Sequence, residues 1–153
     1  MWETAFLAVS IVAMIAWVIL ILLPRKPFLM AAVLYLGAGL LSFIYTAVLI
    51  ALLANWVDGV ALNGGAAGGV DFTTIVGVAA IFASKGGVVV GWTHYLAFDL
   101  FVGLWIARDA DAKEFNRFVQ APILFATFMV GPVGLFIWLI VRERRARKSG
   151  RWE

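Results

Sequence analysis

The run AFLAVSIVAMIAWVILILL, residues 5–23, contains no charged side chain. As a helix rising 1.5 Å per residue it covers about 28 Å, close to the ~30 Å hydrocarbon core of a bilayer. Three more long apolar runs follow it along the chain. The sequence therefore predicts an all-α integral membrane protein, a single membrane domain over residues 1–153 with four transmembrane helices. The expected spans are residues 5–23, 28–54, 88–107 and 119–141.

The composition supports a membrane location. The chain is 64% hydrophobic and 14% charged, whereas soluble domains carry about 25% charged residues. It has no cysteine, which excludes disulfides, thiolate metal sites and cysteine nucleophiles. Too little polar surface is available for a protein of this size to be solvated by water alone.

The first apolar run is expected to be a retained helix. A secretory signal peptide has a basic segment before its apolar core and small residues at its cleavage site. Here Glu3 precedes the run, Pro24-Arg25-Lys26-Pro27 follows it, and no small-x-small site is present. No transit peptide is recognised ahead of the run either.

The segment between the second and third spans is expected to lie outside the hydrocarbon core. Residues 55–69 contain Asp58, Asn63 and five glycines, which predicts a loop. Residues 72–84 are apolar, but thirteen residues reach only ~20 Å as a helix. We expect this segment to form a short interfacial or re-entrant helix.

The fourth span and the tail carry two further signals. Gly131 and Pro132, followed by Gly134, fall in the middle of the span and predict a helix kink. The tail, residues 142–153, holds six of the twelve basic residues, which favours binding to anionic lipid rather than to nucleic acid. Four spans would place both termini on one side, and the tail favours the cytoplasm, with seven basic residues on that side and five on the other.

The third span contains the sequence GWTHYLAFDLFVGLW, residues 91–105. His94 is the single histidine of the chain, and Asp99 lies near the middle of the helix by residue count. A central aspartate costs roughly 2.5–3.5 kcal/mol on membrane-insertion scales. Such a residue is expected to face the interior of the bundle and to find a partner there.

Helical geometry separates these two side chains. Asp99 is four residues from Tyr95, so the two share a face. His94 lies about 140° away around the helix, because successive residues turn by about 100°. The face of Asp99 also carries Trp92, Val102 and Gly103, and the face of His94 carries Phe98, Phe101 and Trp105.

Two interpretations of the third span remain open. In the first, Asp99 and His94 hydrogen-bond to neighbouring helices and hold the bundle together. In the second, they line a substrate cavity and act as acid and base. A single histidine, with the other carboxylates in loops, does not favour a metal site, and no cofactor is expected.

The same segment resembles a known family. Residues 91–103 with Trp105-Ile106, and later Pro122, residues 127–129 and residues 131–135, are similar to the signature of the abscisic-acid-deficient-four-like family. The resemblance covers about the second half of the chain, and the first two spans match in hydropathy alone.

The resemblance implies a carotenoid-like isoprenoid as ligand, because plant members are chloroplast membrane proteins needed to form neoxanthin from violaxanthin. It suggests a redox-neutral isomerisation in which an epoxide oxygen is protonated while a proton leaves a neighbouring carbon. His94 and Asp99 would supply the acid and the base, and the lining of the substrate site would include Trp92, Tyr95, Phe98, Gly103 and Trp105. Without a transit peptide, the expected location is a bacterial inner membrane.

Two other functions are compatible with the sequence. The first is a non-catalytic partner that binds a carotenoid or lipid and assembles with an enzyme. The second is a small transporter that uses Asp99 and His94 as a proton relay. Because four spans are few for a transporter, that function would require the protein to form a homo-oligomer.

Overall fold

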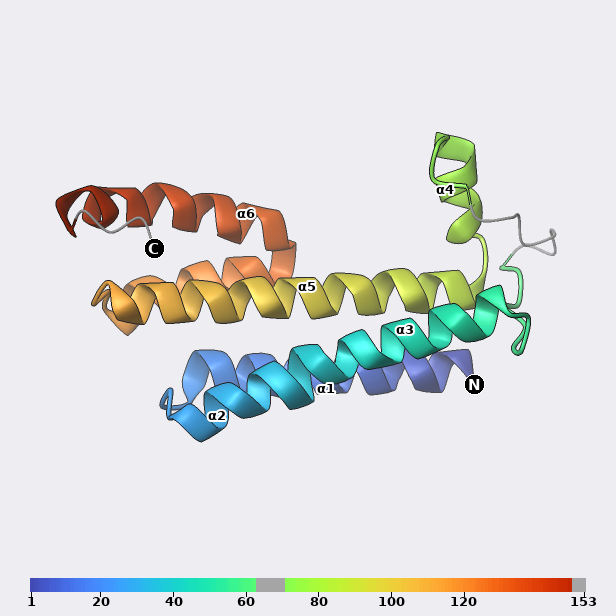
Figure 1. Ribbon diagram of the computed structural model, residues 1–153, viewed down its shortest axis with the longest axis horizontal. Helices are drawn as coiled ribbons and strands as arrows, with labels where there is room; N and C mark the ends of the chain where they lie inside the picture. Colours follow the sequence, from blue (N-terminus) through green and yellow to red (C-terminus); the bar gives the residue numbers. More distant parts are fainter. Residues whose placement is uncertain (63–70, 150–153) are drawn as a thin grey trace.

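A computed structural model describes residues 1–62 and 71–149 of the chain. The architecture is all-α, and four helical segments are long and apolar enough to cross a membrane (Figure 1). The prediction of an all-α integral membrane protein with four such helices is confirmed. The segments are α1 (Trp2–Leu22), then α2 (Pro27–Ala32) continued by η1 (Val33–Gly39) and α3 (Leu40–Leu53), then α5 (Lys85–Ala112) and α6 (Arg117–Ser149).

A short helix, α4 (Ile75–Ile81), lies between the second and third long segments, as expected. Its first turn is capped by Thr74, whose hydroxyl accepts a hydrogen bond of 3.0 Å from the backbone N–H of Gly77. Figure 1 shows α4 standing at a steep angle to the long helices. Of the predicted loop, residues 63–69 lie outside the described part of the chain, as do residues 150–153 of the tail.

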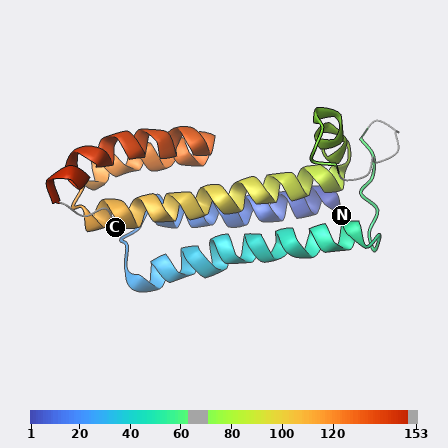
Figure 2. The same cartoon turned by 45° about the horizontal axis from the view of Figure 1, so that its top comes forward.

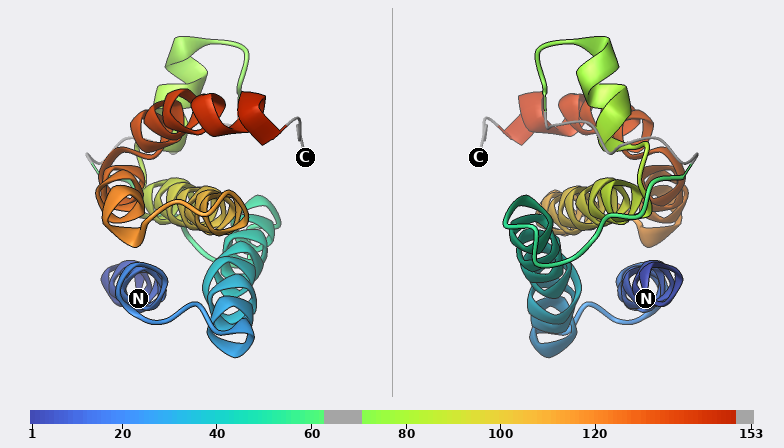
Figure 3. Two further views of the ribbon diagram at one scale, coloured as in Figure 1. Left: turned by 90° about the vertical axis from the view of Figure 1, so that its left-hand side faces the viewer. Right: turned by 90° about the vertical axis from the view of Figure 1, so that its right-hand side faces the viewer.

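Helix α5 is the centre of the bundle and packs against α1, against η1 and α3, and against α6 (Figure 3). Small residues allow these close approaches, because membrane helices pack mainly by van der Waals contact. A Cβ on Gly103 would lie 2.3 Å from the ring of Trp17, and one on Gly37 would lie 2.8 Å from Leu100. The two glycines therefore fix how closely α5 contacts α1 and η1.

Helix α6 breaks in the middle and reverses its direction. Val130 has non-helical backbone angles, φ −148° and ψ 68°, directly before Gly131 and Pro132. Pro132 then falls in the first turn of the following helix, where its missing N–H removes no helical hydrogen bond. We call residues 117–129 the first arm of α6 and residues 131–149 its second arm (Figures 1 and 2).

Contacts with α5 define the direction of each arm. The first arm begins next to the end of α5 and reaches Tyr95, whose hydroxyl donates to the carbonyl of Met129. The second arm starts beside the middle of α5 and reaches Asp109, which accepts hydrogen bonds from Trp138 and Arg142. The second arm therefore runs parallel to α5, back toward the end at which α6 began.

Because α6 reverses, the N-terminus and the end of α6 lie at opposite ends of the bundle (Figure 1). The expectation that both termini share one side assumed a fourth helix that continues straight through. The apolar run of residues 119–141 is long enough to cross a bilayer if straight. Hydropathy does not distinguish a straight helix from two half-length arms.

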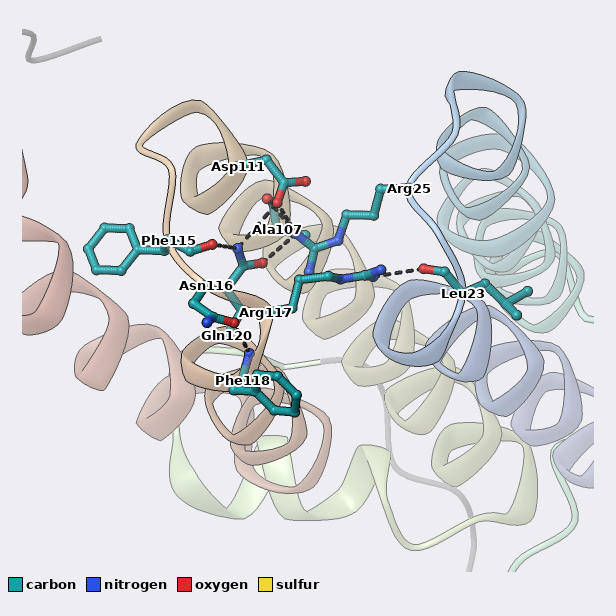
Figure 4. A network of polar contacts seen from close by, with 9 residues as sticks. All are labelled: Leu23, Arg25, Ala107, Asp111, Phe115, Asn116, Arg117, Phe118 and Gln120. Atoms are coloured by element: carbon teal, nitrogen blue, oxygen red, sulfur yellow. Dashed lines mark hydrogen bonds and ion pairs between the residues drawn. The ribbon is translucent and has the colours of Figure 1, made fainter.

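The turn that follows α1 is tied to the turn that precedes α6. Arg25, with a side chain 8% exposed, donates to Asp111 at 2.6 Å and to the carbonyl of Ala107 at 3.0 Å, and it also contacts Gln120 (Figure 4). Arg117 donates to the carbonyl of Leu23 at 2.7 Å. These bonds join α1, α5 and α6 at one end of the bundle.

Asp109 connects the second arm of α6 to α5. Its carboxylate accepts from Lys113 at 2.6 Å, from Arg142 at 2.7 and 3.0 Å, and from the indole N–H of Trp138 at 3.0 Å. The side chain of Asp109 is only 7% exposed. Its charge is thus compensated in place by two cations and one neutral donor.

Replacing Asp109 by alanine should destabilise the fold strongly. Removing one partner of a buried ion pair leaves uncompensated charge and costs about 3–5 kcal/mol. Glu3, whose side chain is 78% exposed and pairs with Lys85 at 41% exposure, provides the control, because loss of an exposed pair costs about 0–1 kcal/mol. Thermal unfolding in detergent measures both. Equal losses for Asp109→Ala and Glu3→Ala would contradict the role given to Asp109.

Candidate functional site

His94 lies on the face of α5 that looks toward α3. Its ring stacks on Phe98, with centroids 4.6 Å apart, and contacts Tyr45 of α3 at 5.4 Å. The histidine is exposed, and within the described chain its imidazole has no hydrogen bond to another residue. The imidazole is therefore open to a polar group from outside the described chain.

A groove of about 410 Å³ lies beside this histidine, between the η1–α3 segment and α5. Phe98 connects the two features, because it lines the groove and also stacks on His94. One wall is built by η1, a π-helix, and such widened turns are frequent at functional sites. The lining residues are Leu34, Tyr35, Ala38, Gly39, Ser42, Ala97, Phe98 and Phe101.

The groove is almost wholly apolar. Ser42 contributes a hydroxyl to its lining, but that hydroxyl already donates to the carbonyl of Ala38 at 2.8 Å. On the η1–α3 side, the small side chains of Ala38, Gly39 and Ser42 leave room in the groove. The rings of Phe98 and Phe101 form the opposite wall. Such a shape accommodates a long apolar chain. Tyr35 adds a second hydroxyl to the lining, and His94 lies next to the groove, stacked on Phe98.

Asp99 and Tyr95 lie on a different face of α5, against α6. The Tyr95 hydroxyl donates to the carbonyl of Met129 at 3.1 Å, at the end of the first arm. A Cβ on Gly131 would lie 1.9 Å from Oδ1 of Asp99, so the carboxyl group is in direct contact with the start of the second arm. Oδ2 of Asp99 is buried and has no hydrogen-bond partner among the described residues.

These contacts place Tyr95 and Asp99 beside the break in α6, where backbone groups lack helical hydrogen bonds. A helix that ends inside a bilayer leaves carbonyl groups without partners, and a helix that begins there leaves N–H groups. Tyr95 satisfies one such carbonyl. Asp99 brings negative charge or a hydrogen-bonding carboxyl to the amino end of the second arm, where a helix dipole favours it.

The structure divides the predicted site residues between several places. Trp92 stacks on Tyr95 at 5.4 Å and on Phe6 at 5.6 Å, and its indole N–H donates to Ser10 at 3.0 Å. It therefore belongs to the side of α5 that carries Tyr95 and Asp99.

The other predicted residues lie elsewhere. Gly103 packs against Trp17, and the guanidinium of Arg142 lies over the ring of Trp105, 5.4 Å from its centroid. Phe98 remains with His94. His94 and Asp99 have no common neighbour in these contacts, so the structure does not bring the two together at one site.

The η1–α3 wall of the groove was not among the residues predicted to bind substrate. Its signal in the sequence is the small-residue group of Gly37, Ala38, Gly39 and Ser42, which also predicts close helix packing. Gly37 does pack closely, against Leu100 and Ala16, whereas Ala38, Gly39 and Ser42 line the groove. Only the register of η1 on α5 separates these two roles.

Within residues 1–62 and 71–149, no group of three or more His, Asp or Glu side chains is close enough together to hold a metal ion. A second hollow, of about 500 Å³, lies at the N-terminal end of the bundle beside Trp2 and Lys85, away from the predicted site residues.

A family model described as ABA DEFICIENT 4-like matches residues 4–138 of this chain. The match includes the first two long helical segments as well as the motifs of α5 and α6. No curated protein and no protein of known structure shows significant similarity to the chain.

Gly131→Ala should destabilise the break in α6, because the new methyl group would overlap the carboxyl of Asp99. Overpacking of this kind costs about 1–3 kcal/mol. In the double variant Asp99→Ala/Gly131→Ala the overlap is gone, so its loss of stability should be smaller than the sum of the single losses. Thermal unfolding in detergent gives the three values.

Gly39→Ala is the matched control for this cycle. A Cβ there would meet only the carbonyl of Leu34, at 3.2 Å, so its effect should be smaller than that of Gly131→Ala. Additive losses at Asp99 and Gly131 would show that the two residues are not in contact.

Proposed function

The chain belongs to the ABA DEFICIENT 4-like family, and we propose that it binds a carotenoid-like isoprenoid within the membrane, in the groove between the η1–α3 segment and α5. Membership in this family suggests a role related to carotenoid or neoxanthin biosynthesis. In this proposal the polyene chain lies along the groove, and a polar end group of the ligand meets His94.

The observation that carries the proposal is the position of His94 beside an apolar groove, stacked on Phe98, which lines it. The imidazole is exposed, stacks on Phe98 and has no hydrogen-bond partner in the described chain. A carotenoid with an oxygen on its end ring has the matching pattern, a long apolar body and a single hydrogen-bonding group. A plain lipid acyl chain would fill the groove but would leave the imidazole unpaired.

The geometry favours binding over an isomerisation carried out by His94 and Asp99 together. An acid and a base that act on one end ring must both reach it. His94 faces Tyr45 and the groove, whereas Asp99 faces Gly131 of α6. Asp99 is more readily explained by the break in α6 than by the ligand, and it would enter the chemistry only if α6 moved away.

Pigment binding can be tested in a bacterial host that accumulates epoxidised carotenoids. We expect purified protein to retain pigment in absorbance and chromatography, and Ser42→Phe to lose most of it, because the new ring would fill the groove. Leu36→Phe adds the same ring at a position that is 68% exposed and outside the groove lining, so pigment should be retained. His94→Ala should lower pigment retention, and Asp99→Asn should leave it unchanged.

Two results would contradict the proposal. Equal pigment retention in the Ser42 and Leu36 variants, with both proteins folded by circular dichroism, would remove the groove as the binding site. A new pigment that forms with the wild-type protein and disappears with Asp99→Asn would instead establish conversion and place Asp99 in it.

A further inference from the structure

We infer that α6 is a re-entrant hairpin that does not cross the membrane, and that the end of the bundle where it begins and ends is an interaction surface for the anionic headgroups of the cytoplasmic leaflet. We call this end the basic end. It contains the turn after α1, the turn between α5 and α6, and the end of α6 (Figures 1 and 4).

The length of the first arm supports the first part of this inference. The thirteen residues of the first arm reach only about 20 Å as a helix, which is less than the ~30 Å hydrocarbon core. The chain then turns at Val130, beside Asp99 in the middle of α5. The second arm returns along α5 to Asp109. Non-helical backbone at membrane depth is tolerated where it lies against protein. Gly131 is buried and contacts Asp99 of α5, whereas the side chain of Val130 is 54% exposed.

The distribution of basic residues supports the second part. The chain has twelve Lys and Arg residues. Lys85 lies at the opposite end of the bundle, paired with Glu3, and Arg151 lies outside the described residues, which leaves ten. These ten all fall at the basic end: Arg25, Lys26, Arg108, Lys113, Arg117, Arg142, Arg144, Arg145, Arg147 and Lys148.

Ten basic residues at one end of the bundle and one at the other strongly indicate the orientation of the protein in the membrane. Basic residues close to helix ends are retained on the cytoplasmic side of a membrane. Counted over the same eleven residues, a straight fourth span would instead give six basic residues on one side and five on the other. Within the part of the basic end whose side chains are described, Lys26 and Arg108 are exposed and are free to meet anionic lipid, whereas Arg25, Lys113 and Arg142 pair with Asp111 and Asp109.

The absence of cysteine makes the topology directly measurable. Single cysteines at Trp56, Ala112 and Ser149 would be treated with a membrane-impermeant thiol reagent, in intact bacterial spheroplasts and after permeabilisation. We expect Trp56→Cys to be labelled in intact spheroplasts, and Ala112→Cys and Ser149→Cys to be labelled only after permeabilisation. Labelling of Ser149→Cys together with Trp56→Cys would show that α6 crosses. Labelling of Ala112→Cys in intact spheroplasts would reverse the orientation.

The lipid partner is tested with purified protein in nanodiscs of phosphatidylcholine alone or with phosphatidylglycerol. We expect phosphatidylglycerol to raise the unfolding temperature, and the Lys26→Gln/Arg108→Gln double variant to lose most of that increase. Lys85→Gln, at the other end of the bundle, should keep it. An increase that is the same in all three proteins would overturn the assignment of the basic end to anionic lipid.

Discussion

The structure depends on one constraint, which is that every backbone polar group inside a bilayer needs a partner within the protein. Helix α6 breaks at Val130 and exposes the ends of two helical arms at membrane depth. The polar face of α5 meets this need, since Tyr95 donates to the carbonyl of Met129 and Asp99 lies against Gly131. The arms also pack on each other, as a Cβ on Gly134 would lie 2.1 Å from the hydroxyl oxygen of Thr127.

Two faces of helix α5 therefore have different roles. The side that carries Tyr95 and Asp99 supports the α6 hairpin, and its continuation to Asp109 anchors the second arm through Trp138 and Arg142. The side that carries His94 and Phe98 faces α3 and the apolar groove. Asp99 and His94 are close in sequence but have different roles. Asp99 supports the structure of α6, whereas His94 is placed to bind a ligand.

Much of the fold follows from the sequence by simple physics. Apolar length predicts the four long helices, and the thirteen apolar residues 72–84 are too few for a fifth. The 140° separation of His94 and Asp99 around one helix is also predictable. The reversal of α6 is not, because 23 apolar residues suit a straight span and two short arms equally well, and Gly131-Pro132 indicates a bend without its angle. The groove depends on the register of η1 against Ala97 and Phe101, which no single segment encodes.

The most direct measurement is the distance between spin labels at Phe118 and Ile140, introduced as cysteines into this cysteine-free chain and read by pulsed electron paramagnetic resonance. Both positions are exposed, 88% and 57%. In a straight helix their 22-residue separation corresponds to about 33 Å. In the hairpin the two positions lie on adjacent arms near the same end, where neighbouring helix axes are about 8–10 Å apart. A distribution centred well below 30 Å is the predicted result, and one centred near 33 Å would contradict the reversal and the role given to Tyr95 and Asp99.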